Sequence, residues 1–138
     1  MGQAYSISRT IQQPYDAALA AVREALTDQG IGVVTEFDVR ESFLKNLDVE
    51  VPPQMILGAC QSGLAYQALQ VDPSIAVLIP VNVVVRYLDE ESTGVEAFDP
   101  ATIAGLAGGD AVRRLATDAR TRIVAALSSL TDDSGHHN

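Results

Sequence analysis

A long apolar stretch, residues 54–87, constrains the fold of this chain more than any other feature. Its sequence, QMILGACQSGLAYQALQVDPSIAVLIPVNVVVRY, predicts a strand over residues 54–59, a helix over residues 63–70 and a long strand over residues 75–88. Cys60, the only cysteine, lies where the first strand gives way to the helix. The stretch therefore predicts two buried strands joined by a short helix.

Three residues inside this stretch mark where the chain turns. Ser62 is a preferred N-cap residue, so we expect it to begin the helix. Asp72 stands before a proline and predicts a turn after the helix. Pro80 cannot donate a hydrogen bond within a sheet, so we expect a bulge or a change of pairing partner in the second strand.

The segment before this stretch reads as strand, helix and strand. Residues 4–11 alternate apolar with polar side chains, which is typical of a half-buried strand. Pro14 fits the first turn of a helix, and Gly30 fits the left-handed residue that ends one. A second strand is expected over residues 31–37.

A short second helix is expected next. Asp38 and Glu41 have the spacing of a capping box. In this motif each side chain accepts a hydrogen bond from the backbone N–H of the other residue at the start of the helix. We expect the helix to end near Leu47, with Phe43, Leu44 and Leu47 on its buried side.

The C-terminal third predicts a hairpin and a long helix. Residues 89–94 form a polar turn, and residues 95–98 return as a strand. Residues 99–109 read as a loop with about one helical turn. Asp110 is expected to cap a helix over residues 111–130. The apolar residues of that helix recur on one face: Val112, Leu115, Ala116, Ala119, Ile123, Ala126, Leu127 and Leu130.

These elements predict a single α+β domain over residues 1–130. We expect a mixed or antiparallel sheet of about five strands packed against helices, with a long C-terminal helix. A chain of 138 residues suits one domain of this kind. The polar residues 131–138 are expected to form a disordered tail.

Net charge and hydropathy limit which binding partners and which cellular compartment are expected. The formal net charge of −9 disfavours nucleic acid and anionic membrane surfaces, since both attract basic proteins. No apolar run reaches the roughly 18 residues of a membrane span, and no signal-peptide pattern is present. A single cysteine cannot form an internal disulfide, which favours a reducing, cytoplasmic location.

Two interpretations of Cys60 remain open. Its position before a helix N-terminus favours the thiolate form, as in reactive cysteines. Alternatively, Cys60 is a small buried apolar residue, which is a common state of a free cysteine. A nucleophilic cysteine generally needs a base, and both histidines, His136 and His137, lie in the tail. These two histidines alone make a poor metal site, so we expect no bound metal, and no cofactor is identified.

Three further residues are candidates for a binding site. Asn82 is polar within the apolar run, and Arg86 lies on the same strand face because side chains alternate with period two. Asn82 either satisfies a backbone group in a bulge after Pro80 or faces a pocket. If this face is concave, Asn82 and Arg86 are the polar residues of a ligand site. Tyr66 could reach the same site from the helix after Cys60, although helical tyrosines more often mark a core or interface rim.

With these residues in view, the chain resembles the family called domain of unknown function 302. The resemblance rests on segments that span about half the chain: GIGVVTEFDV, FLKNLDV, ILGAC, LAYQAL, DPSIAVLIPVNVVV and FDP. It implies a small bacterial or archaeal cytosolic α+β domain, often a dimer, with no settled activity.

One departure from the family pattern concerns Val81. Relatives commonly carry a cysteine between the proline and the asparagine that stand here as Pro80 and Asn82. A two-thiol redox or soft-metal scheme implied by the resemblance would pair that cysteine with Cys60. With Val81 in its place, such a scheme lacks its second thiol.

The sequence thus favours a non-enzymatic, homodimeric domain that binds a small ligand or serves as an accessory. Its ligand pocket is expected between the sheet and the helix after Cys60, lined by Cys60, Tyr66, Asn82 and Arg86. One alternative is a thiol, sulfur or redox-handling protein that works through Cys60. Another is a purely structural dimerisation module.

Overall fold

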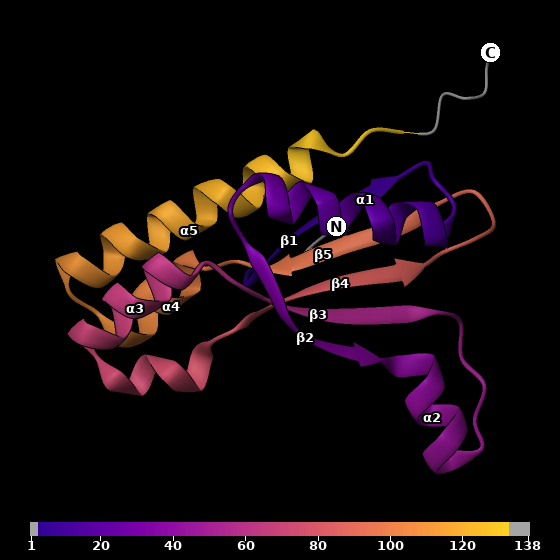
Figure 1. Cartoon of the computed structure of the whole chain (residues 1–138), viewed down its shortest axis with the longest axis horizontal. Helices are drawn as coiled ribbons and strands as arrows, with labels where there is room; N and C mark the ends of the chain where they lie inside the picture. The colour runs from indigo at the N-terminus through magenta and orange to yellow at the C-terminus, as the bar shows by residue number, and fades with distance from the viewer. Residues whose placement is uncertain (1–2, 133–138) are drawn as a thin grey trace.

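The computed structural model describes residues 3–132 and shows five strands with helices before, between and after them (Figure 1). In chain order the elements are β1 (Ser6–Ile11), α1 (Tyr15–Asp28), β2 (Gly32–Asp38), α2 (Val39–Leu47), β3 (Gln54–Cys60), α3 (Ser62–Val71), the 3₁₀ helix η1 (Pro73–Leu78), β4 (Val81–Tyr87), β5 (Thr93–Phe98), α4 (Ala101–Ala107) and α5 (Asp110–Ser129).

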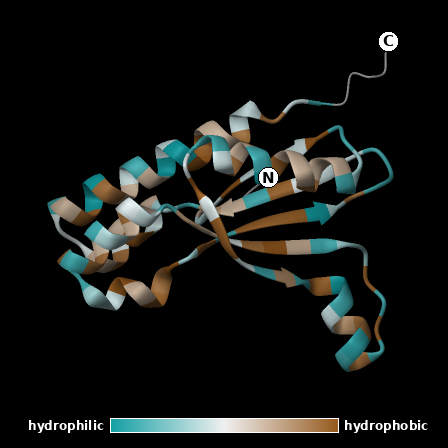
Figure 2. Cartoon of the chain, in the orientation of Figure 1, coloured by the Kyte–Doolittle hydropathy of each residue, from teal (hydrophilic) through white to brown (hydrophobic). Residues whose placement is uncertain are grey.

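The strands form one antiparallel sheet in the order β1-β5-β4-β3-β2. The predicted α+β class, the five-stranded sheet and the long C-terminal helix are confirmed. Strand β4 lies at the centre, between β3 and β5, and β1 and β2 are the two edges. Figure 2 shows hydrophobic residues concentrated along β3 and β4, as expected for inner strands.

Helices α1 and α5 cover one face of the sheet (Figure 1). Several alternate residues of β3, β4 and β5 that point at these helices are fully buried, among them Leu57, Val83 and Val85. They belong to a continuous core that also takes in the apolar stripes of both helices. Burial of this apolar surface is the main stabilising contribution to the fold.

Two arginines tie helix ends to neighbouring elements across this layer. Arg9 of β1 donates hydrogen bonds to the carbonyl oxygens of Leu127, at 2.7 Å, and Leu130. Arg122 of α5 donates to the carbonyl oxygen of Gln29, at 3.0 Å, just after α1 ends. Each cation therefore satisfies carbonyls at the negative end of a helix dipole.

A second, smaller core lies beyond one end of the sheet, among α3, η1, α4 and the first half of α5. Only Ile75, Ile103 and Val112 are buried in it among the described residues. The inward residues of α3 pack there but stay half-buried, and no residue of α3 is fully buried.

Several predicted helix boundaries agree with the structure, and two caps do not. The Asp38 carboxylate accepts a hydrogen bond from Glu41 N at 3.0 Å, and Gly30 has a positive φ of 73° after α1. However, Gln61 rather than Ser62 caps α3, since its side-chain oxygen accepts from Leu64 N at 2.7 Å. Helix α5 begins after Gly109 without a side-chain cap, so the predicted Asp110 cap is wrong.

The long strand predicted over residues 75–88 is wrong in its first half. The Asp72 side chain accepts a hydrogen bond from Ser74 N at 3.0 Å and begins the 3₁₀ helix instead. Strand β4 starts at Val81, after a cis peptide bond between Ile79 and Pro80. An apolar run is compatible with either a buried strand or a buried helix, and here the Asp-Pro turn decides between them.

Helix α2 is less buried than its apolar pattern predicts. It projects past the edge strand β2, away from the layer of α1 and α5 (Figure 1). Because no second layer covers it, only Val39 is buried, and Leu44 and Leu47 are 44% and 63% exposed.

The predicted tail begins with two described residues. Thr131 O accepts a hydrogen bond from the Gln13 side chain, and Asp132 Oδ1 accepts one from Gln12 N at 2.8 Å. The rest of the predicted tail, with His136 and His137, lies outside the described residues. None of the described helices has the length and apolar character required to cross a membrane.

Candidate functional site

An apolar pocket of about 90 Å³ lies between the end of β3, α3, α4 and α5. A smaller cavity of about 40 Å³ shares its wall and extends toward Ile31 and Arg122. The pocket is lined by Ala59, Cys60, Gln61, Leu64, Ala65, Ala68, Ile75, Ile79, Val81, Pro100, Ile103, Val112, Leu115, Ala116 and Ala119.

Small side chains at the helix contacts leave this space open. Ala65 and Ala68 of α3 face Ala116 and Ala119 of α5 across the pocket, each pair spaced three residues apart on one helix face. Longer side chains at these positions would fill the gap between the helices. The pocket is therefore built into the sequence by alanines at inward positions.

Cys60 is partly exposed and lines the pocket. Gln61, beside it, uses its side-chain oxygen to cap α3. Among the described residues that line the pocket, Cys60 is the only one with a titratable side chain. Val81, which pairs with Ala59 across the two strands, lines the same pocket.

Tyr66 points to a different surface. It is 67% exposed and lines a groove on the outer side of the contact between α3 and α5. We call this the outer groove; its volume is about 440 Å³. It is lined by Tyr66, Gln67, Gln70, Val71, Ala111, Arg114, Leu115 and Asp118.

Asn82 and Arg86 lie on the sheet face opposite α1 and α5, which we call the uncovered face. Asn82 pairs with Gly58 of β3, and Arg86 pairs with Gln54. The two side chains share a face, as the alternation predicts, but Asn82 is exposed and neither residue lines the pocket.

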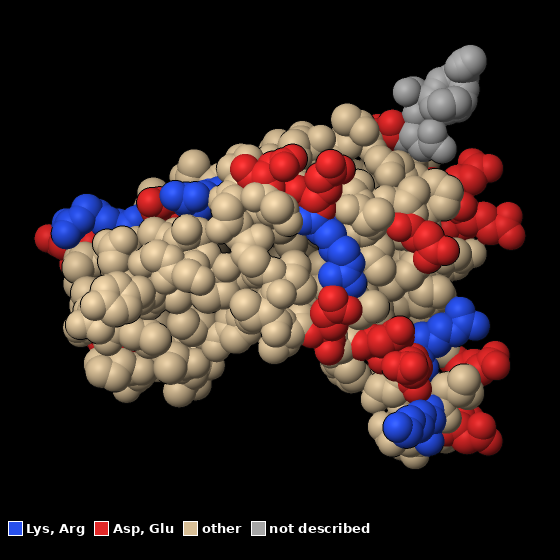
Figure 3. All heavy atoms as spheres, in the orientation of Figure 1, with Lys and Arg blue, Asp and Glu red and all other residues tan. Residues whose placement is uncertain are grey.

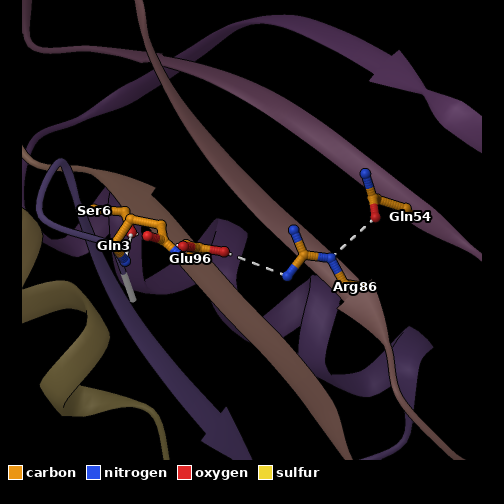
Figure 4. Close-up of polar contacts among 5 residues, drawn as sticks. All are labelled: Gln3, Ser6, Gln54, Arg86 and Glu96. Atoms are coloured by element: carbon orange, nitrogen blue, oxygen red, sulfur yellow. Dashed lines mark hydrogen bonds and ion pairs between the residues drawn. The ribbon is translucent and has the colours of Figure 1, made fainter. Parts of the chain in front are cut away.

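Arg86 is held in a polar network on the uncovered face (Figure 4). Its Nε donates to Gln54 Oε1 at 3.1 Å, and its guanidinium lies 3.3 Å from Glu96 Oε1. Ser6 Oγ donates to the other Glu96 oxygen at 2.6 Å. The Ser6 hydroxyl and, beside it, the Arg86 guanidinium hold the pKa of Glu96 below its ordinary value.

The structure therefore distributes the four candidate residues over three surfaces: Cys60 in the pocket, Tyr66 in the outer groove, and Asn82 with Arg86 on the uncovered face. Sequence reasoning missed Glu96 and Ser6, although both sit on strands with polar alternation. It placed Ala116 and Ala119 on the inward face of the last helix, but it did not predict the space that they leave opposite α3. No cluster of three or more potential metal ligands occurs within residues 3–132.

The side of the pocket formed by β3, α3, η1 and β4 is nearly free of charge, whereas α5 on the other side carries charged residues. Residues 51–85 contain one charged side chain, Asp72. Figure 3 shows a broad uncharged area over α3 and η1, whereas acidic and basic side chains crowd the region of α2. An uncharged rim is compatible with entry of an apolar molecule.

Comparison with known proteins gives a family and a fold. The family model described as "Domain of unknown function DUF302" matches residues 7–130. No curated protein matches the chain. A crystal structure of an uncharacterized conserved DUF302 protein from Bacillus stearothermophilus superposes with a TM-score of 0.80 at 22% identity, covering 91% of this chain and 98% of that one.

Proposed function

This chain belongs to the domain of unknown function family DUF302, as its sequence resemblance indicated, and we propose that it binds a small apolar ligand in the pocket beside Cys60 without catalysing a reaction. The observation that carries the proposal is the pocket itself. A lining of alanine and aliphatic side chains favours an apolar guest over bound water, since water requires several polar partners.

The chemistry of the lining supports binding rather than proton transfer. General acid–base catalysis needs a titratable group within hydrogen-bond reach of the reacting atoms. Around this pocket the described residues offer one thiol and the Gln61 amide, and the amide oxygen is engaged by Leu64 N. Such a site selects its guest by shape and hydrophobicity.

The pocket can be tested with 1-pentanol as a neutral probe. Binding is measured from amide chemical shifts in NMR titrations. Ala119→Leu adds about three carbons to the pocket wall and should weaken pentanol binding about tenfold or more. Ala20→Leu makes the same substitution on the exposed face of α1 and should leave binding unchanged. Equal binding by wild type and Ala119→Leu would overturn the assignment of the pocket.

A thiol-dependent function that works through Cys60 is the second candidate, because Cys60 is partly exposed and lines the pocket. If the pocket only binds, Cys60→Ser should retain pentanol affinity within about threefold, since a hydroxyl replaces a thiol of similar size. Native and denaturing mass spectra separate the two functions. A covalent adduct on Cys60 that is lost on reduction would favour sulfur or redox chemistry.

We further propose that the domain acts as a homodimer in the reducing cytoplasm, joined through β2 and α2. Strand β2 is an edge, with one side of its backbone free for pairing. Large apolar side chains are exposed on β2, on α2 and just after it: Val34, Phe37, Leu44, Leu47 and Val49. A second copy would cover this surface.

Charges on α2 and the residues after it support a second copy as the partner. Arg40 and Lys45 have no carboxylate within 4 Å among the described residues, and acidic Asp48 and Glu50 follow nearby. Two copies of this mixed segment, packed antiparallel, would pair opposite charges. Leu47→Glu should therefore give a monomer in light scattering, and Leu106→Glu, at a similarly exposed residue of α4, should leave the dimer intact.

A further inference from the structure

The apolar pocket and the outer groove lie on the two sides of one helix contact. Helix α3 packs on α5, and Leu115 of α5 lines both spaces. Ala68 faces the pocket at this contact, whereas Gln67 and Val71, on either side of it in sequence, face the groove. Leu115 is therefore the wall between the apolar pocket and the polar groove, and a guest that occupies both must pass its side chain.

Arg114 provides an uncommitted positive charge in the outer groove. The other three arginines of α5 pair with carboxylates: Arg113 with Asp110 at 2.5 Å, Arg120 with Asp99 at 3.3 Å and Arg122 with Asp118 at 2.9 Å. Arg114 has no carboxylate within 4 Å among the described residues, in a chain with twice as many acidic as basic residues. Asp118, the acidic residue of the groove, is paired with Arg122.

Two other features of the groove also favour an anion. Ala111, in the first turn of α5, lines it, and the N-terminus of this 20-residue helix has no side-chain cap. The uncapped N–H groups and the helix dipole place partial positive charge there, and the acidic residue of this first turn, Asp110, is paired with Arg113. From α3, Tyr66, Gln67 and Gln70 add neutral hydrogen-bond donors.

We propose that the ligand is a small carboxylate with a short apolar tail. Its tail enters the pocket, and its carboxylate lies in the outer groove against Arg114 and Tyr66. This inference rests on the proposed binding function and names the chemical class of the guest. A pocket of about 90 Å³ is smaller than the roughly 150 Å³ apolar cavity that admits benzene, so it suits a short alkyl tail such as that of a four- or five-carbon acid.

Pentanoate and 1-pentanol form a matched pair of probes, because they differ in the head group alone. Both are titrated into the full-length protein and followed by calorimetry or NMR. We expect pentanoate to bind about five- to tenfold more tightly than pentanol, because Arg114 forms a charge-assisted hydrogen bond with the carboxylate. Raising the salt concentration should reduce this preference.

Arg114→Gln should abolish the preference for pentanoate and leave pentanol affinity unchanged. Arg113→Gln is the control, since it removes the neighbouring arginine, which does not line the groove. If both arginine variants keep the preference, or if pentanoate binds no more tightly than pentanol, the carboxylate proposal is overturned while the apolar pocket stands. If neither probe binds wild type, the proposed function fails, and this inference fails with it.

Discussion

Two regions of this molecule contain the same types of aliphatic residue but pack them differently. The body comprises the sheet, α1 and the second half of α5, and the pocket end comprises α3, η1, α4 and the first half of α5. Sixteen of the described residues form one buried cluster in the body, whereas the cluster of the pocket end contains three. The body therefore supplies stability, and the pocket end retains unfilled space.

The difference lies in side-chain size and in layering. In the body, Leu26, Leu57 and Ile123 interdigitate between a sheet and two helices. At the pocket end, α3 and α5 meet through alanines, and only the ends of β3 and β4 reach the space between them. Close-packed interiors resist a guest, and loosely packed ones accept one, so a binding site is expected where the packing is sparse.

The sharpest test of this difference compares one buried aliphatic residue from each region. Leu57→Ala removes a fully buried side chain beneath α1 and α5 and should lower the free energy of unfolding by about 3–5 kcal/mol. Ile103→Ala removes an 8% exposed side chain beside an existing cavity and should cost about 2 kcal/mol or less. Chemical denaturation followed by circular dichroism measures both.

Equal losses at the two positions would contradict the division into a dense body and a sparse pocket end. The slope of the unfolding free energy against denaturant concentration provides a control. If it stays unchanged in both variants, each loss reflects native-state packing rather than a change in the unfolded state.

How much the sequence predicts also differs between the two regions. In the body, local signals and tertiary packing agree: residues 4–11 and 31–37 alternate as strands, and Asp38 and Gly30 mark helix ends that the structure confirms. At the pocket end the signals conflict. The apolar residues 75–79 suit a strand, yet the Asp72 cap turns most of them into η1.

The candidate site was predictable only in part, because a pocket depends on which faces meet. Cys60 was placed correctly at the end of β3, where it now lines the pocket. Tyr66, Asn82 and Arg86 were expected beside it, but Tyr66 lies in the outer groove, and Asn82 and Arg86 lie further along the sheet on the uncovered face. The alanines that create the space carry no chemical signal and become informative only when α3 and α5 are known to face each other.

Gly58 of β3 lies near the junction of the two regions, and a substitution there tests how tightly the sheet is packed against its neighbours. A Cβ at this position would lie 2.0 Å from Thr35 Oγ1 and 3.0 Å from Pro80 Cγ. Gly58→Ala should therefore destabilise the fold by about 1–3 kcal/mol through overpacking. Thermal and chemical unfolding of the variant measure the loss.

Gly32→Ala is the matched control on the neighbouring strand, because its new Cβ would meet Cys60 O at an ordinary 3.6 Å. It should change stability by less than about 1 kcal/mol. Adding Thr35→Ala to Gly58→Ala should recover part of the loss. If the double variant recovers nothing, contact with Thr35 is not the cause.

Arg9 tests whether the body depends on polar links as well as on packing. Arg9→Met keeps an aliphatic stem but removes the donors to Leu127 O and Leu130 O, and should cost about 1–2 kcal/mol. Arg120→Met breaks an exposed ion pair with Asp99 and should cost at most about 0.5 kcal/mol. Similar costs for the two variants would show that capping the end of α5 adds nothing beyond a surface charge.

The smallest expected effect belongs to Glu96 on the uncovered face. Hydrogen bonding by Ser6, together with the Arg86 charge, lowers the pKa of Glu96 from its ordinary value of 4.5. A carboxyl whose pKa is lowered by folding stabilises the fold at any pH above its ordinary pKa. This stabilisation is lost as the pH falls through the pKa of the folded state. Glu96→Gln should therefore cost about 0.5–1 kcal/mol at neutral pH and nothing once Glu96 is protonated. Glu90→Gln, in the exposed turn between β4 and β5, is the control for loss of a carboxylate outside the network. A loss at Glu96 that stays constant from neutral to acidic pH would mean that the network holds Glu96 by shape rather than by charge.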